Sequence, residues 1–174
     1  MLLAGYVALQ NWDGLTGNLA DRVLAPDNLI LMAFAYPLVK VLHEFGHAWC
    51  VRRFGGNVTE MGVMFLLFIP IPYVDASQSN FFPSHAKRAL VALSGILTEL
   101  GIGALAILVW SQLDPGVGRA IAFNIIVICT ISSLLFNGNP LLRFDAYYVL
   151  ADLTQSPNLG NRGNAIVGHW TTRA

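Results

Sequence analysis

The residues best suited to chemistry form one short motif, His43-Glu44-Phe45-Gly46-His47. On a helix, positions i and i+4 lie on one face about one turn apart, so His43 and His47 can reach the same metal ion. Glu44 follows the first histidine and is placed to bond a water on that ion rather than the ion itself. Zinc lowers the pKa of such a water to near neutrality, and a neighbouring carboxylate can take the proton. The motif therefore predicts zinc-dependent hydrolysis, with Glu44 as the general base.

A catalytic zinc ion also needs a third protein ligand and an open fourth position. We favour Asp145, because it follows a break at Asn139-Pro140 and a short helix can place it at the depth of the histidines. Glu99 lies near the middle of an apolar segment and is better explained as a hydrogen-bonded helix contact than as a ligand. Three further candidates are Cys50, a small residue on the histidine face, Asp75, a turn residue, and His85, an interfacial side chain.

The composition places this chemistry in a membrane. The 174 residues are 55% hydrophobic and 11% charged, against roughly 25% charged in an ordinary soluble domain. A chain this apolar cannot cover itself with polar surface, so a bilayer must solvate part of it. The net charge is zero and no basic run is present, which argues against nucleic-acid binding. Histidines and a glutamate are costly to bury in such a setting, so each is a functional candidate.

Three apolar segments are long enough to cross a bilayer, which takes about 20 residues. They run from about Asn28 to Val51, from about Ala89 to Trp110 and from about Ala120 to Phe136. Asn139 suits a helix cap and Pro140 suits the first position of a helix, so we expect a short fourth helix over Pro140 to Leu153. The expected fold class is an all-α integral membrane protein with three transmembrane helices and this short helix.

The segment between the first two spans has a different pattern. Val58 to Val74 is strongly apolar, yet Pro70 and Pro72 exclude both a regular helix and a central strand. We expect a β-hairpin that dips into the membrane from one side. Irregular backbone is tolerated at that depth only where protein or a water-filled cavity meets its hydrogen bonds. The hairpin is therefore expected to form one wall of a wet cavity around the metal.

The chain is expected to form one domain, because it has no internal repeat and no low-complexity linker. The core spans residues 28–159, after an interfacial or linker segment at 1–27 and before a C-terminal tail at 160–174. Basic residues flank the hairpin and follow the third span, and the positive-inside rule then places both on the cytoplasmic side. These residues are Arg52, Arg53, Lys87, Arg88 and Arg143.

The chain resembles the site-2 protease family of intramembrane zinc metalloproteases. The likeness rests on HEFGH at 43–47, on NPLLRFD at 139–145, and on the order helix, apolar hairpin, helix, helix, over about Leu29 to Leu159. It is most similar to a bacterial branch with the stretches RRFGG, EMGVMF, PYVDAS and FNxNPLLRFD, where x is Gly138 in this chain, and that branch is often fused to secretion-adaptor modules.

The resemblance implies that His43, His47 and Asp145 bind one zinc ion and that Glu44 is the catalytic base. It also implies that Asn139 and Pro140 position the substrate or shape the site. The chain departs from the family at Ala146, where glycine is usual. The added methyl group is expected to leave ligation intact, but tighter packing beside the metal could slow or abolish turnover.

These observations predict a zinc metalloendopeptidase of the bacterial inner membrane, with its active site towards the cytoplasm. Its substrate would be a membrane protein or peptide, unwound and added as a strand along Met64 to Tyr73. A divalent-metal transporter is one alternative, because such proteins also place histidines and glutamates on transmembrane helices. The other is a protease-like platform in a peptide-export system, with metal but little turnover and a secretion adaptor as partner.

Overall fold

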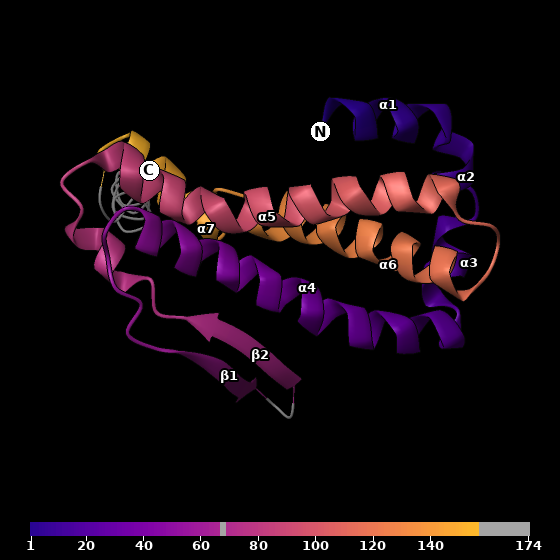
Figure 1. Cartoon of the computed structure of the whole chain (residues 1–174), viewed down its shortest axis with the longest axis horizontal. Coiled ribbons are helices and arrows are strands. Elements are labelled where there is room, and N and C mark those ends of the chain that lie inside the picture. Colours follow the sequence, from indigo (N-terminus) through magenta and orange to yellow (C-terminus); the bar gives the residue numbers. More distant parts are fainter. Residues whose placement is uncertain (67–68, 157–174) are drawn as a thin grey trace, which may run out of the picture.

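Three long helices form the body of the protein in a computed structural model that describes residues 1–66 and 69–156 (Figure 1). All three are long and apolar enough to cross a membrane. The expected spans are therefore present, and each helix extends slightly beyond the expected ends. The helices are α4 (Pro26–Arg53), α5 (His85–Gln112) and α6 (Val117–Ile131), the last continued by a π-helix, η2 (Ser132–Asn137).

Local sequence explains where these helices begin and how the third one ends. Pro26 occupies the first turn of α4, where its missing N–H group would have no helical partner. The hydroxyl of Ser84 accepts a hydrogen bond from the Lys87 amide and caps α5. Where the third helix ends, the Gly138 amide donates to the Ser133 carbonyl at 2.7 Å. This wide turn is the geometry of a π-helix, a form frequently found at functional sites.

The short helix after the third span begins later than the sequence predicts. Helix α7 runs over Asp145–Leu153, whereas residues 140–144 form turns and bends. The Asn139 side chain accepts a hydrogen bond from the Leu141 amide at 3.0 Å, which closes a local turn instead of capping a helix. Phe144 then adopts an extended backbone with φ −109° and ψ −165°. The prediction of a helix starting at Pro140 is wrong, and Asp145 becomes the first helical residue.

The apolar segment between α4 and α5 forms a two-stranded antiparallel sheet, as expected. Strands β1 (Met61–Leu66) and β2 (Ile69–Val74) pair with Met61 opposite Val74 and Leu66 opposite Ile69. Strand β2 lies beside α4, and β1 lies on the outer side of the hairpin (Figure 1). A short helix, η1 (Ser77–Phe81), then leads to α5.

The register of the hairpin explains its two prolines. The Asp75 amide donates to the Glu60 carbonyl at 2.8 Å, so these two residues form a hydrogen-bonded pair. Bonded and non-bonded pairs alternate along an antiparallel ladder. Pro72, opposite Val63, and Pro70, opposite Phe65, therefore fall at non-bonded positions. Their missing N–H groups would have faced away from β1, which is the position that an edge strand allows for proline.

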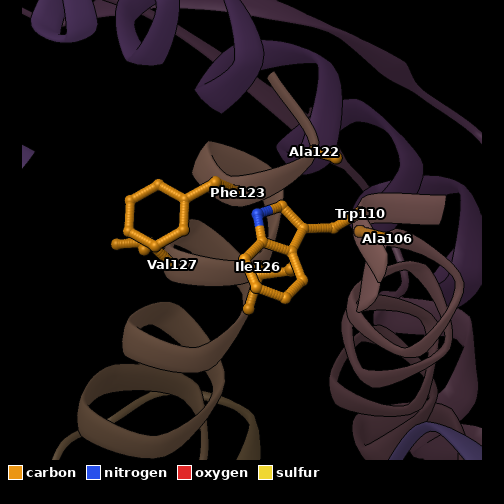
Figure 2. Packing of buried hydrophobic residues seen from close by; sticks show 6 residues of the cluster. All are labelled: Ala106, Trp110, Ala122, Phe123, Ile126 and Val127. Atoms are coloured by element: carbon orange, nitrogen blue, oxygen red, sulfur yellow. The ribbon is translucent and has the colours of Figure 1, made fainter. Parts of the chain in front are cut away.

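Apolar packing joins α5 and α6 at the end of the bundle farthest from the hairpin. Figure 2 shows the side chains that gather there, which are Ala106 and Trp110 of α5 and Ala122, Phe123, Ile126 and Val127 of α6. Two arginines cover this cluster. Arg119 lies 4.4 Å above the ring of Trp110, and Arg22 lies 3.8 Å above the ring of Phe123.

The N-terminal segment is helical and packs on the bundle. It consists of α1 (Leu2–Gln10), α2 (Trp12–Thr16) and α3 (Leu19–Leu24), of which α1 lies along α5 (Figure 1). The expected tail at 160–174 lies outside the described residues.

Candidate metal centre

His43 and His47 lie one turn apart on the face of α4 that meets α5. Both are buried, and their Nε2 atoms are 3.1 Å apart. Gly46 lets the two helices approach closely here, because a Cβ atom at this position would lie 3.0 Å from the Ser94 carbonyl and would strike Thr98. The motif thus presents two imidazoles to a neighbouring helix at short range.

Asp145 completes a group of three possible metal ligands. Its Oδ2 atom lies 3.2 Å from Nε2 of His43, and its Oδ1 atom lies 3.4 Å from Nε2 of His47. The three residues each offer a ligand atom within 4.8 Å of the others. Helix α7 packs on α5, and its first residue is therefore held beside the histidine pair although it follows them by about a hundred positions in the sequence.

The acceptors near Nδ1 of the two imidazoles indicate which nitrogen of each ring faces the centre. Nδ1 of His47 lies 2.8 Å from the Val91 carbonyl, which can only accept, so Nδ1 carries the hydrogen. Nδ1 of His43 lies 3.1 Å from Oε1 of Glu99. In a neutral imidazole, the other nitrogen then presents a lone pair. Two lone pairs and a carboxylate meet, and such an arrangement repels itself unless a proton or a cation lies between them.

The dimensions of this group fit zinc. The three donor separations are 3.1, 3.2 and 3.4 Å. Tetrahedral zinc with bonds of about 2.0–2.1 Å places its ligand atoms roughly 3.3 Å apart. Oδ2 of Asp145 is buried without a hydrogen-bond partner among the described residues, as expected for an atom whose natural partner is a cation.

Gly95 makes room for the centre, and sequence reasoning missed it. A Cβ atom at this position would lie 2.5 Å from Nε2 of both His43 and His47. No side chain larger than hydrogen fits without displacing an imidazole. The spacing offered a signal, since Val91, Gly95 and Glu99 recur every four residues and so share one face of α5.

A cavity of about 460 Å³ adjoins the centre and is lined by His43, Glu44 and Asp145. Ile71 and Pro72 of β2 form one wall, so the hairpin does border the site. Most of the remaining lining is apolar and comes from α4, α6 and η2, including Met32, Tyr36, Ile128, Ile131 and Phe136. The cavity can therefore hold an apolar chain segment next to the carboxylate of Glu44.

The other residues considered as third ligands have different partners. Asp75 closes the base of the hairpin, where hydrogen bonds from Ser77 and Thr59 lower its pKa to about 2. His85 contacts Arg88 at the start of α5. Cys50 is buried in an apolar cluster with Val51 and Val91.

Asn139 and Pro140, expected to contact substrate, are not among the residues that line the cavity. Asn139 is occupied in the turn described above, and Pro140 is exposed. Asn137, two residues earlier, is buried and does line the cavity.

Glu99 is a hydrogen-bonded contact between helices, as expected, and lies outside the group formed by His43, His47 and Asp145. It is fully buried, and its carboxylate accepts hydrogen bonds from Lys40 of α4 at 2.6 Å and from Ser133 of η2 at 2.7 Å. Ser132 and Asn137, also of η2, donate to it at 3.1 and 3.3 Å. These residues connect all three long helices beside the metal centre, and only Glu99 among them stood out in the sequence.

No family model matches the chain, and no curated protein or solved structure matches it either. The site is therefore interpreted from its own geometry. The resemblance to the site-2 protease family, drawn from the motifs, stays a prediction.

Proposed function

We propose that this chain is the catalytic core of an intramembrane zinc metalloprotease. The observation that supports the proposal most strongly is the meeting of three electron-pair donors, Nε2 of His43, Nε2 of His47 and the Asp145 carboxylate, at the separations that zinc requires. Glu44 lines the adjoining cavity, where a base is needed. The three apolar helices locate this chemistry in a membrane.

Each residue then has a defined task in peptide hydrolysis. His43, His47 and Asp145 would hold the ion. When bound, zinc would polarise the substrate carbonyl and lower the pKa of a water to near neutrality. Glu44 would take a proton from the attacking water as the C–O bond forms, and would pass it to the amine nitrogen as the C–N bond breaks. The apolar lining of the cavity excludes bulk water and favours substrates with apolar side chains.

Strand β2 is suited to hold an unwound substrate beside the centre. It contributes Ile71 and Pro72 to the cavity wall. At Pro70 and Pro72 the free edge offers carbonyl oxygens but no N–H groups, so a substrate strand would donate amides to β2. The substrate carbonyls opposite these residues would find no donor there and would stay free to reach the metal.

The proposal includes a position in the membrane. Arg52 and Arg53 end α4, and Lys87 and Arg88 begin α5, so basic residues surround the hairpin. By the positive-inside rule, the hairpin would enter a bacterial inner membrane from the cytoplasmic side. The substrate would be a membrane protein or membrane-bound peptide, and a secretion adaptor is the partner that the motif resemblance implies.

Metal analysis and cleavage assays of purified protein in detergent test the proposal together. Wild-type protein should contain one zinc ion per chain, and Asp145→Ala should contain none. Glu44→Gln should retain zinc but fail to cut synthetic transmembrane peptides, with products read by mass spectrometry. Equal zinc in wild type and Asp145→Ala would exclude Asp145 as a ligand, and undiminished cleavage by Glu44→Gln would exclude Glu44 as the base.

Two other outcomes would favour the alternatives. Zinc binding by a wild-type protein that cuts no peptide would favour a protease-like platform, with Ala146→Gly as the variant in which to look for restored turnover. Zinc flux into liposomes would favour a transporter. The described residues argue against transport, because the apolar cluster around Trp110 and Phe123 occupies the bundle beyond the polar centre.

A further inference from the structure

Glu99 stands at the centre of a polar network that the hydrolytic mechanism does not use. Its side chain is fully buried in the middle of α5, a setting in which a carboxylate is expensive to keep. Every protein group that bonds to it is a donor, namely Lys40 Nζ, the hydroxyls of Ser132 and Ser133, and the amide of Asn137. The network therefore holds Glu99 as an acceptor.

One side of this acceptor faces the metal centre. Oε1 of Glu99 lies 3.1 Å from Nδ1 of His43, and this buried nitrogen has no aligned hydrogen bond among the described residues, so Glu99 is the acceptor within its reach. The opposite ring nitrogen of His43 faces Asp145. An acceptor at Nδ1 keeps the hydrogen on that nitrogen and leaves the lone pair of Nε2 for a metal.

The second histidine has a matching support of a different kind. Nδ1 of His47 donates to the backbone carbonyl of Val91, two turns before Glu99 on the same face of α5. Gly95 lies between these two acceptors, opposite both Nε2 atoms. One face of α5 thus carries an acceptor for each histidine of α4. Between the two acceptors, Gly95 leaves room for both imidazole rings.

We propose that Glu99 is a positioning residue, which orients His43 for metal binding while Lys40 and the polar groups of η2 hold its carboxylate in place. The inference rests on the proposed metal centre and adds to it a residue that touches neither the ion nor the substrate. Orienting partners of this kind typically change metal affinity by about 10- to 100-fold when they are removed.

A purely structural role for Glu99 makes a different prediction. Replacing a buried ion pair by apolar residues of similar volume is often neutral or even stabilising. Glu99→Met alone would leave the partly buried charge of Lys40 without its partner. If Glu99 only joined helices, a Lys40→Met/Glu99→Met double variant would be more stable than Glu99→Met and would bind zinc like the wild type. If Glu99 orients His43, the double variant regains that stability but not the metal affinity.

The test measures zinc affinity by chelator competition, the absorption spectrum of the cobalt-substituted protein and thermal stability, all on the full chain in detergent. Glu99→Gln keeps the size of the side chain but replaces one acceptor oxygen by an NH2 group and removes the negative charge. We expect it to weaken zinc binding about 10- to 100-fold and to alter the cobalt spectrum. The Lys40→Met/Glu99→Met variant should show the same two changes, although it should be more stable than Glu99→Met alone.

A control variant separates positioning from loss of stability. Val127→Ala weakens the distant apolar cluster, which contains no partner of Glu99. It should keep the wild-type zinc affinity and cobalt spectrum, even where it melts earlier. Zinc affinity and a cobalt spectrum unchanged in Glu99→Gln, or recovered in the Lys40→Met/Glu99→Met variant, would overturn the inference alone. A wild-type protein that binds no zinc would overturn the proposed function as well.

Discussion

Helices α5 and α6 pack against each other in two different ways along their length. Around Trp110 and Phe123 the contact is almost wholly apolar, with aliphatic side chains filling the space between the rings. About three turns away, where α6 continues as η2, the same pair of helices encloses Glu99, Ser132, Ser133 and Asn137. The first contact is built from apolar side chains, and the second gathers polar ones.

The difference suggests that the apolar contact contributes mainly to stability and the polar contact mainly to the proposed metal site. Close packing of apolar side chains is favourable wherever it occurs. Burial of a polar group is costly unless each donor and acceptor is paired. The partners of Glu99 provide that pairing next to His43, at the site where we propose that the metal binds. Changes at the two contacts should therefore affect different measurements.

Gly95→Ala should give the largest effect on metal binding. Its Cβ atom would lie 2.5 Å from Nε2 of both histidines, so at least one imidazole must move away from the centre. We expect zinc to be lost from the purified protein, and stability to fall by about 1–3 kcal/mol from overpacking. Gly101→Ala on the same helix is the matched control, because nothing lies within 4 Å of the added methyl group. It should keep its zinc, and zinc retained by Gly95→Ala would show that the histidines face elsewhere.

Phe123→Ala should lower the stability of the protein and leave its zinc affinity unchanged. Phe123 is 3% exposed, and its ring packs in the apolar cluster beneath Arg22. Removing the ring should lower the free energy of unfolding by about 3–5 kcal/mol. The folded protein should bind zinc with wild-type affinity, as measured by chelator competition below the melting temperature. A weaker affinity would mean that the apolar contact and the metal centre are coupled, and the separation drawn above would not hold.

Arg88→Met should have a smaller effect, and it should lower both the zinc affinity and the stability. Arg88, in the first turn of α5, donates to Asp152 of α7 at 2.7 Å and to the Phe82 carbonyl at 2.9 Å. Without this contact, α7 should be held less firmly and present Asp145 less well. We expect zinc affinity to fall severalfold and the free energy of unfolding to fall by about 1–2 kcal/mol. Arg53→Met, at an exposed position at the end of α4, is the control and should change neither. Equal zinc affinity in both variants would mean that α7 is held by its packing on α5 alone.

Much of the site could be predicted because its residues are close in sequence or break a local rule. His43 and His47 are one helical turn apart, so helical geometry alone brings them together. Pro70 and Pro72 permit only an edge strand, and the hairpin has β2 in that position. The start of α7 was mispredicted because the Asn139 side chain forms a local turn that competes with the helix.

The polar network around Glu99 could not be predicted in the same way. Serines and an asparagine near the end of an apolar span have many ordinary explanations, and Ser132, Ser133 and Asn137 become a set only because η2 turns them towards α5. The importance of Gly95 likewise depends on which atoms of α4 lie opposite it. Neither fact follows from periodicity within a single helix.

Composition and the spacing within one helix are local properties, so the residues alone predict the membrane setting and the pairing of two imidazoles. The three-dimensional fold was needed to show that Asp145 lies 3.2 Å from His43, and that a glycine and a buried glutamate on α5 face the same histidines. Such contacts depend on the rotation and depth of separate helices, which side-chain packing across the whole bundle sets.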